Sequence, residues 1–413
     1  QTIKKAWGIP ELRKKIIFTA LILLIFRIGN AIPVPYVNTD LLSSYLEGMS
    51  TTVLGLYNVM SGGAFAQATV FALGVQPYIN SSIIIQLLTI AIPALERLAR
   101  DGGEEGKKKI QSITRYATVA IAILQGWGYY MLMKNYGILT EKSFWVALVI
   151  IASFIAGSSF VMWMGEQITE FGIGNGISII LFAGILSRVP SMVSSMISGL
   201  RAGTLAWWAA VLVVLGILAL IVLITWVNGA ERRIPVQYAK RQVGRKMYGG
   251  QASYIPIKVN MTGVMPIIFA STLCSLPGLI FRFINLDASS HPALYAFFSV
   301  FNYNSALYLI VYVLLIVAFN YFYVAIQYNP VDIANQLRKN NGTIPGIRPG
   351  KPTLIGAVFL AIVAGFPIIL GNITGTSIQL GGTTLLIVVG VALETGRSLE
   401  GYMTARYHKG FLE

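Results

Sequence analysis

The chain has 413 residues, of which 55% are hydrophobic and only 11% are charged. Because charged residues make up about a quarter of a typical soluble protein, this composition excludes an ordinary soluble domain and indicates a membrane protein with many spans. The single cysteine excludes an internal disulfide and two histidines exclude a histidine-rich metal site, while the net charge of +15 fits the excess of Lys and Arg on the cytosolic side of membrane proteins.

Ten apolar stretches follow one another along the chain, each close to the roughly 20 residues that a membrane-spanning helix needs. Three of them are weaker than the others. Residues 175–197 contain Arg188 and Pro190, residues 354–370 are few, and residues 381–400 lose their apolar character toward the end. The clear ones are 16–32, 73–93, 113–133, 144–164, 205–227, 259–281 and 304–326. The sequence therefore predicts an all-α polytopic membrane protein with ten transmembrane helices.

The basic residues predict the orientation of these helices. With the N-terminus on the cytosolic side, 25 of the 31 Lys and Arg residues fall on or beside cytosolic segments, five fall on outer segments, and Arg27 lies within the first helix. Cytosolic loops carry the positive excess in membrane proteins. The split therefore supports ten spans with both termini cytosolic, because one helix more or fewer would mix the two groups.

Two of the cytosolic segments, 228–258 and 327–353, are long and basic. The first contains two β-like stretches on either side of a basic glycine turn, and the second ends in NNGTIPGIRPGKPT. Loops of this kind can dock an acidic or RNA-rich partner. The positive bias of cytosolic loops explains their charge equally well, but it does not explain their length.

A short motif occurs twice, as GVQPYI at 74–79 and as GVMPII at 263–268. The glycine, valine, proline and isoleucine coincide, and small hydroxyl residues follow both copies. One copy begins the second helix and the other begins the seventh, so each half of the chain has five helices. An odd number of spans inverts the second half in the bilayer, which predicts an inverted-topology repeat of residues 1–199 and 200–413. Chance similarity in a chain rich in Gly and Ile is the alternative.

The predicted helices differ in polarity. Residues 144–164, 205–227 and 304–326 are almost uniformly apolar, as lipid-facing helices are, whereas four others carry small and polar residues that suit a wet or mobile path. These four are 73–93, 175–197, 259–281 and 381–400. None of the 16 Asp and Glu residues lies deep in a span; Glu166 and Glu394 come nearest, at cytosolic ends. An aliphatic path without carboxylates suits a substrate of variable sequence better than one specific solute.

Three further features have two interpretations each. FGIGNGIS at 171–178 resembles a phosphate-binding loop, but no strand precedes it, so the start of a closely packed helix is favoured. Arg27 is better explained as a helix-paired or snorkelling side chain than as a substrate site. The outer segment 33–72 ends in YNVMSGGAFAQATV, which is too short to span; its residues alone favour an ordinary outer loop over a folded-back segment.

Six motifs occur in order across nearly the whole chain. They are FRIGNAIPVP, FALGVQPYINSSIIIQLL, MWMGEQITEFGIGNGISIILFAG, YAKRQVGRKMYGGQASYIPIKVNMTGVMPIIFAS, PGIRPGKPT and GGTTLLIVVGVALET. Through them the sequence resembles the SecY family, the channel subunits of the bacterial protein translocase. The chain departs from the family before Leu354, where family members usually carry additional, partly basic residues.

The resemblance implies a fold and a set of site residues. The two inverted-repeat halves of five helices form a clamshell around a central pore, and residues 1–199 include a plug at about 57–68. Helices 2, 3, 7 and 8 border a lateral gate to lipid. The implied pore ring is Val75, Ile79, Leu181, Ile268 and Ile387. The implied plug residues are Tyr57, Ser61, Gly62, Gly63 and Phe65. The implied gate residues are Asn80, Ser82, Gln86, Gln125, Ser271 and Thr272. The implied contacts of the cytosolic loops with partners are Arg245, Lys246 and Arg348.

The resemblance also implies a function. The chain would be a protein-conducting channel that passes unfolded secretory polypeptides across the bacterial plasma membrane and releases transmembrane segments laterally into lipid. It would be a passive pore and not an enzyme, without cofactor or metal, so that a partner supplies the energy. The implied partners are SecE- and SecG-type small membrane subunits, the SecA ATPase, the ribosome, signal sequences, nascent secretory or membrane polypeptides, and membrane lipids.

Two other functions stay open on the residues alone. A secondary transporter for a small solute also uses inverted repeats, but it usually keeps a buried carboxylate and a polar substrate site near the midplane. A membrane scaffold without transport activity is the second alternative. Solute uptake into vesicles would support the transporter, and ion leak after removal of the plug would exclude the scaffold.

Overall fold

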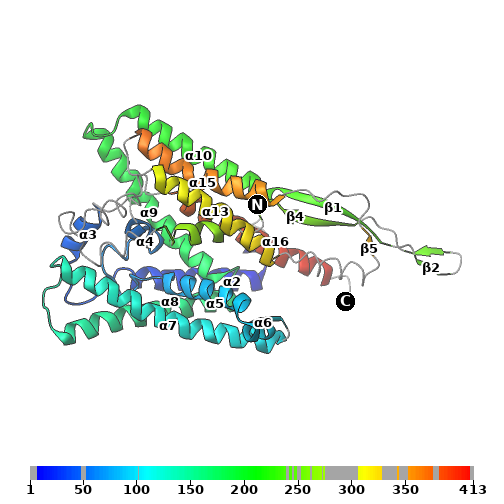
Figure 1. The fold of residues 1–413 in the computed structure, drawn as a ribbon, viewed down its shortest axis with the longest axis horizontal. Coiled ribbons are helices and arrows are strands. Elements are labelled where there is room, and N and C mark those ends of the chain that lie inside the picture. Colours follow the sequence, from blue (N-terminus) through cyan, green and yellow to red (C-terminus); the bar gives the residue numbers. More distant parts are fainter. Residues whose placement is uncertain are drawn as a thin grey trace. The chain divides into compact units, whose positions relative to one another are not determined.

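The computed structural model of the chain is mainly helical (Figure 1). It describes residues 7–47, 53–100, 102–238, 241–243, 246–248, 253–260, 263–271, 273–274, 306–327, 342–343, 352–374 and 381–409. The chain divides into two compact units. Unit 1 comprises Gln1–Ala202 and Val391–Glu413, and unit 2 comprises Gly203–Gly390. The repeat halves 1–199 and 200–413 stay a prediction.

Unit 1 is built from helices. They are α2 (Pro10–Gly29), α3 (Thr39–Glu47), α4 (Val53–Met60), α5 (Gln76–Ala91), α6 (Pro93–Arg100), α7 (Gly103–Asn135), α8 (Phe144–Phe171) and α9 (Gly176–Arg201), followed by the last part of α16 (Gly382–Lys409). α7 packs against both α5 and α8, and α8 also packs against α2 and α9. A small apolar cluster of Leu12, Ile173 and Leu399 fixes the end of α16 to α2 and to the turn before α9.

A sharp corner separates α5 from α6. The two helices form an angle of 106° across a break at Ile92. Ile92 has φ −108° and ψ 109°, an extended conformation. Pro93 explains this, because a proline disfavours the helical conformation for the residue before it. The predicted second span therefore ends at this corner, as its range 73–93 requires.

The outer segment between α2 and α5 folds back into unit 1. The Val34 amide donates to the Ala68 carbonyl at 2.9 Å and the Val70 amide donates to the Ile32 carbonyl at 3.0 Å. Phe65 and Ala68 are almost wholly buried. The expectation of an ordinary outer loop, drawn from the residues alone, is therefore wrong. Its apolar residues are too few to span the membrane, but they are buried against helices instead.

Unit 2 combines helices with a small antiparallel sheet. Its elements are α10 (Trp207–Gly229), β1 (Glu231–Tyr238), β2 (Arg241–Val243), β3 (Lys246–Tyr248), β4 (Ser253–Lys258), α13 (Ala306–Gln327), β5 (Gly342–Thr343), α15 (Pro352–Thr374) and the first part of α16. β1 pairs with β4 from Glu231↔Lys258 to Val236↔Ser253, and β2 pairs with β3. The two β-like stretches predicted in 228–258 are thus present. α15 packs against both α10 and α13.

The helices suit a membrane. Within the described part of the chain, five helices are long and apolar enough to cross a bilayer, or six if the bent pair α5–α6 counts as one span. The five are Phe144–Phe171, Gly176–Arg201, Trp207–Gly229, Leu307–Val324 and Gly382–Met403. Every one of the ten predicted spans overlaps a helical segment, so the structure is consistent with the predicted count. Large apolar side chains such as Leu215, Val222 and Leu314 are exposed, as expected of lipid-facing helices.

Candidate functional site

Residues 57–68, the predicted plug and called the plug segment below, form the end of α4 and the turns that follow it. An aromatic stack anchors them to unit 1. The Phe65 ring stacks on Tyr129 of α7 with 4.3 Å between ring centroids, and Tyr57 meets Phe65 edge-on at 6.2 Å. Tyr129 in turn contacts Phe154 of α8 at 5.1 Å. Each aromatic contact stabilises by about 0.5–1.5 kcal/mol beyond burial of area, so this stack fixes the plug segment to the α7–α8 pair.

Polar side chains of neighbouring helices reach the plug segment as well. Asn30, which ends α2, donates to the Ser61 carbonyl at 3.1 Å. The Arg27 guanidinium lies 3.4 Å from the Gly62 carbonyl and 3.1 Å from the Ser187 hydroxyl oxygen of α9. Arg27 is therefore paired with other elements, as the sequence indicated. It joins α2, α9 and the plug segment.

Helix α9 approaches the plug segment so closely that the contact requires glycine. A Cβ at Gly184 would lie 2.6 Å from the Met60 carbonyl oxygen, and a Cβ at Gly62 would lie 2.9 Å from the Ser187 hydroxyl oxygen. Gly62 and Gly63 also have φ of 71° and 91°, a region that favours glycine. The SGG turn is thus shaped both by backbone conformation and by contact with α9.

The first copy of the repeated motif begins α5. Gly74 has φ 52°, Val75 is the N-cap residue, and Pro77 occupies the first turn, where its missing N–H leaves no helical hydrogen bond unmade. Gln76 donates to the Met60 sulfur at 2.9 Å, and Asn80 hydrogen-bonds the Tyr57 side chain. The start of α5 therefore lies directly against the plug segment.

The second copy has the same local structure in unit 2. Gly263 has φ 62°, and helical residues follow from 265. The amide of Ile268 donates to Val264 at 3.2 Å, as the amide of Ile79 donates to Val75 at 3.0 Å. Both copies are therefore a left-handed glycine followed by a proline-containing first turn. The two copies thus share a local structure, while the internal repeat of the two halves stays a prediction.

The residues of the predicted pore ring fall in two groups. Val75, Ile79 and Leu181 are buried in unit 1, at the starts of α5 and α9. In unit 2, Ile387 is buried on α16, and Ile268 is half-buried. Each group is apolar and lies near the beginning of a helix. The ring that would join the two groups stays a prediction.

The predicted gate residues of unit 1 lie on two helices that pack together. Asn80, Ser82 and Gln86 of α5 and Gln125 of α7 are all half-buried. Of the two gate residues in unit 2, Ser271 donates to the Ile268 carbonyl at 2.9 Å, and Thr272 lies outside the described residues.

A buried link between α5 and α7 was not predicted from the sequence. The Ser81 hydroxyl donates to the Thr114 carbonyl at 2.7 Å, and Ser81 is wholly buried. The serine pair at 81–82 is a visible signal of small polar residues, but only the packing shows that Ser81 faces α7. This bond joins the two helices that carry the predicted gate residues of unit 1.

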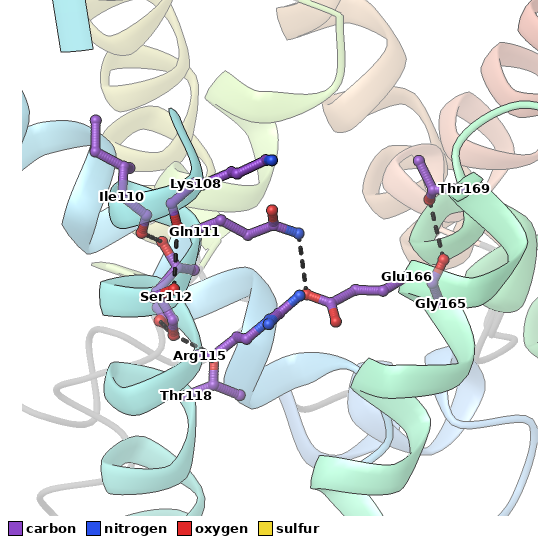
Figure 2. A network of polar contacts seen from close by, with 11 residues as sticks. Lys108, Ile110, Gln111, Ser112, Arg115, Thr118, Gly165, Glu166 and Thr169 are labelled. Atoms are coloured by element: carbon purple, nitrogen blue, oxygen red, sulfur yellow. Dashed lines mark hydrogen bonds and ion pairs between the residues drawn. The ribbon is translucent and has the colours of Figure 1, made fainter. Parts of the chain in front are cut away.

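Two ion pairs mark the predicted cytosolic end of α7. Glu166 of α8 accepts from Arg115 Nε at 2.8 Å and from Gln111 Nε2 at 3.2 Å, so it bridges α7 and α8 (Figure 2). Nearer the start of α7, the Lys107 ammonium lies 3.0 Å from the Glu104 carboxylate and lowers the pKa of Glu104. The second pair is exposed and stabilises little. The sequence indicates Glu166 as a carboxylate near the membrane, but it does not reveal the first pair.

The predicted docking residues are only partly described. Lys246 begins β3 and pairs with Val243 of β2. Arg245 and Arg348 lie outside the described residues. In unit 2, β1 and β4 continue beyond the end of α10 (Figure 1), so the basic hairpin is an extension of that helix.

The fold is similar to that of solved protein-conducting channels. A solved structure described as that of a protein conducting channel matches with a TM-score of 0.62 at 17% identity, covering 96% of this chain and 94% of that one. A structure of canine Sec61 in a ribosome-channel complex matches with a TM-score of 0.62 at 16% identity, covering 96% and 94%.

Sequence relatives identify the family. A family model described as SecY matches residues 69–396. The protein translocase subunit SecY of Aquifex aeolicus is 39% identical over 99% of both chains, and that of Halalkalibacterium halodurans is 40% identical over 100% of both. The chain therefore belongs to the SecY family, and it is a subunit of a protein-translocation channel.

Proposed function

We propose that this chain forms the conducting pore itself, and that residues 57–68 are its plug. The observation that carries the proposal is the burial of this segment against the start of α5 and the middle of α9, beside Gly74, Gln76 and Gly184. A related structure with a TM-score of 0.64 and 17% identity has a title stating that the plug domain of that SecY protein stabilises the closed state and maintains a membrane seal. The same role fits the segment described above.

The constriction is the proposed ring of Val75, Ile79, Leu181, Ile268 and Ile387. Aliphatic side chains around a narrow opening exclude ions because water leaves it, and they can separate when a polypeptide enters. They offer no hydrogen bonds that would select one substrate sequence. The proposed substrate is therefore an unfolded secretory polypeptide.

Lateral release uses the seam between the two copies of the repeated motif. An apolar signal sequence parts α5 from the segment around 265–271, because lipid and the seam solvate an apolar helix comparably. The polar side chains Asn80, Gln86 and Gln125 favour one closed arrangement of the gate helices. They do not hold these helices together so strongly that a signal sequence could not separate them. Transmembrane segments of the substrate then leave into lipid.

The chain is a passive and non-enzymatic conduit, so the energy comes from a partner. The proposed partners are the SecA ATPase and the ribosome, docked on Arg245, Lys246 and Arg348, together with SecE- and SecG-type subunits. Ribosome-bound Sec61 and Ssh1 complexes among the solved structures support the ribosome as a partner. The bacterial relatives support a location in the plasma membrane, with both termini cytosolic.

Site-specific crosslinking tests this proposal. In a Cys274→Ser background, Ile79→Cys is combined with a stalled secretory chain that carries its own cysteine. A disulfide that requires the signal sequence places the polypeptide beside Ile79. Leu215→Cys on the exposed face of α10 is the matched control and should stay unlinked. If no position of the stalled chain links to Ile79→Cys, the pore assignment is wrong, and the transporter alternative returns.

A further inference from the structure

The plug segment is held by its main chain as well as by its side chains. Asn30 donates to the Ser61 carbonyl at 3.1 Å, and the Arg27 guanidinium lies 3.4 Å from the Gly62 carbonyl. The Tyr129 hydroxyl donates to the Phe65 carbonyl. Three carbonyl oxygens within five residues thus meet donor side chains from α2, its C-terminal end and α7.

The Ser61 and Gly62 carbonyls meet side-chain donors of other elements. The Phe65 carbonyl also accepts from the Ala68 amide within the plug segment at 3.2 Å, so Tyr129 is its second donor. Residues 61–68 form turns, and Ser61 and Phe65 are each at most 5% exposed. Buried main-chain polar groups are almost always paired in folded proteins, because an unpaired one loses its hydrogen bonds to water without replacement. The Arg27 contact has a charged donor, but at 3.4 Å it is longer than a typical charge-assisted hydrogen bond.

The shape of the SGG turn presents these oxygens. Gly62 and Gly63 adopt φ of 71° and 91°, and Gly62 packs against Ser187. The backbone can adopt this path readily only at glycine. The donor side chains therefore bind carbonyl oxygens whose positions depend on the backbone conformation of this turn. These positions do not depend on the side chains of the neighbouring plug residues.

We propose that Arg27, Asn30 and Tyr129 are positioning residues that keep the channel closed by recognising the main-chain conformation of the plug. The inference rests on the plug role proposed above and adds which groups hold it. It follows that closure tolerates changes of plug side chains such as Ala66→Ser better than the loss of a donor. Displacement of the plug breaks all three bonds together.

The test measures halide flux through idle channels of the full chain and its small membrane subunits in vesicles. Tyr129→Phe removes one hydroxyl and keeps the stacked ring. The expected increase in flux is about fivefold, the factor that corresponds to a hydrogen bond of about 1 kcal/mol. Tyr130→Phe is the matched control, because the next residue points about 100° away around the helix. Arg27→Met should also leak, and Arg27→Lys, which keeps a cationic donor, should leak less.

Two further measurements distinguish a failure of this inference from a failure of the proposal that residues 57–68 are the plug. A cysteine at Ala64, which is 1% exposed, should react faster with thiol reagents in each leaking variant if the plug itself is released. In a chain lacking residues 57–68, Tyr129→Phe should add no leak. If that deletion alone causes no leak, the plug proposal fails. If the deletion leaks while the donor variants stay tight, or if Tyr129→Phe leaks equally without a plug, the positioning inference is overturned.

Discussion

At the scale of single residues, glycine decides where helices can approach one another. Gly176 opens α9 against α8, and a Cβ there would clash with the Gly165 carbonyl oxygen. Asn175 caps the same helix by accepting from the Ser178 amide at 3.2 Å. The FGIGNGIS segment is thus the start of a closely packed helix, as its residues favoured. The sequence could predict this, because capping and glycine are local signals.

Gly176→Ala should lower the stability of the protein by about 1–3 kcal/mol, the usual range for overpacking. The reason is the forced separation of α9 from α8. Gly229→Ala is the matched control, since nothing lies within 4 Å of a Cβ at that position. Melting temperatures of the two detergent-solubilised variants would check this, and equal melting temperatures would contradict it.

The ion pair of Arg115 and Glu166 belongs to the same scale. The Arg115 side chain is 48% exposed and that of Glu166 is 15% exposed, so solvent screens the pair in part. A double-mutant cycle with Arg115→Ala and Glu166→Ala should give a coupling of up to about 1 kcal/mol, as for other partly exposed pairs. The coupling should shrink as salt rises. A large coupling that ignores salt would show that the pair is desolvated.

At the scale of elements, the two GVxPxI segments have the same local backbone structure. Both begin with a glycine of positive φ, and a Cβ at Gly263 would meet no atom within 4 Å, so its conformation and not its packing requires glycine. The repeat and its position are visible in the sequence. The Ser81–Thr114 link and the Arg115–Glu166 bridge are not, because a partner on another helix is visible only after packing.

Gly74 and Gly263 should respond to substitution in the same order. Asparagine should be tolerated better than alanine, and alanine better than valine, because a side chain in the left-handed region costs about 1–2 kcal/mol and asparagine compensates by local hydrogen bonds. Thermal unfolding of the six variants gives the order. If alanine stabilises either position relative to glycine, the conformational argument fails there.

At the scale of the whole molecule, composition and charge were sufficient to predict a membrane protein with many spans. Apolar runs, basic segments and a repeat predicted the spans, and each predicted span overlaps a helical segment. For the plug segment the prediction from the residues alone, an ordinary outer loop, was wrong. A 12-residue stretch of small and apolar residues is typical both of an exposed loop and of a buried one, and only the surrounding helices decide between them. The family resemblance supplied what local pattern could not.

Ile79→Ser should raise the ion conductance of the idle channel several-fold, because a hydroxyl in the proposed ring keeps water in the constriction. Ile79→Leu should leave the conductance close to that of the unchanged chain. Single-channel recording in planar bilayers would measure both. Equal conductance of the serine and leucine variants would place the barrier elsewhere.

The corner between α5 and α6 has a mechanical consequence. α6 turns away from α5 by 106° and carries Arg97 and Arg100. It packs so closely on α7 that a Cβ at Gly106 would clash with the Leu98 carbonyl oxygen. An amphipathic helix with such residues rests at a membrane surface. In this position α6 would restrain α5: α5 could tilt about the corner at Ile92, but it could not move along its own axis. If the proposed lateral gate opens, α5 is therefore expected to swing about this corner.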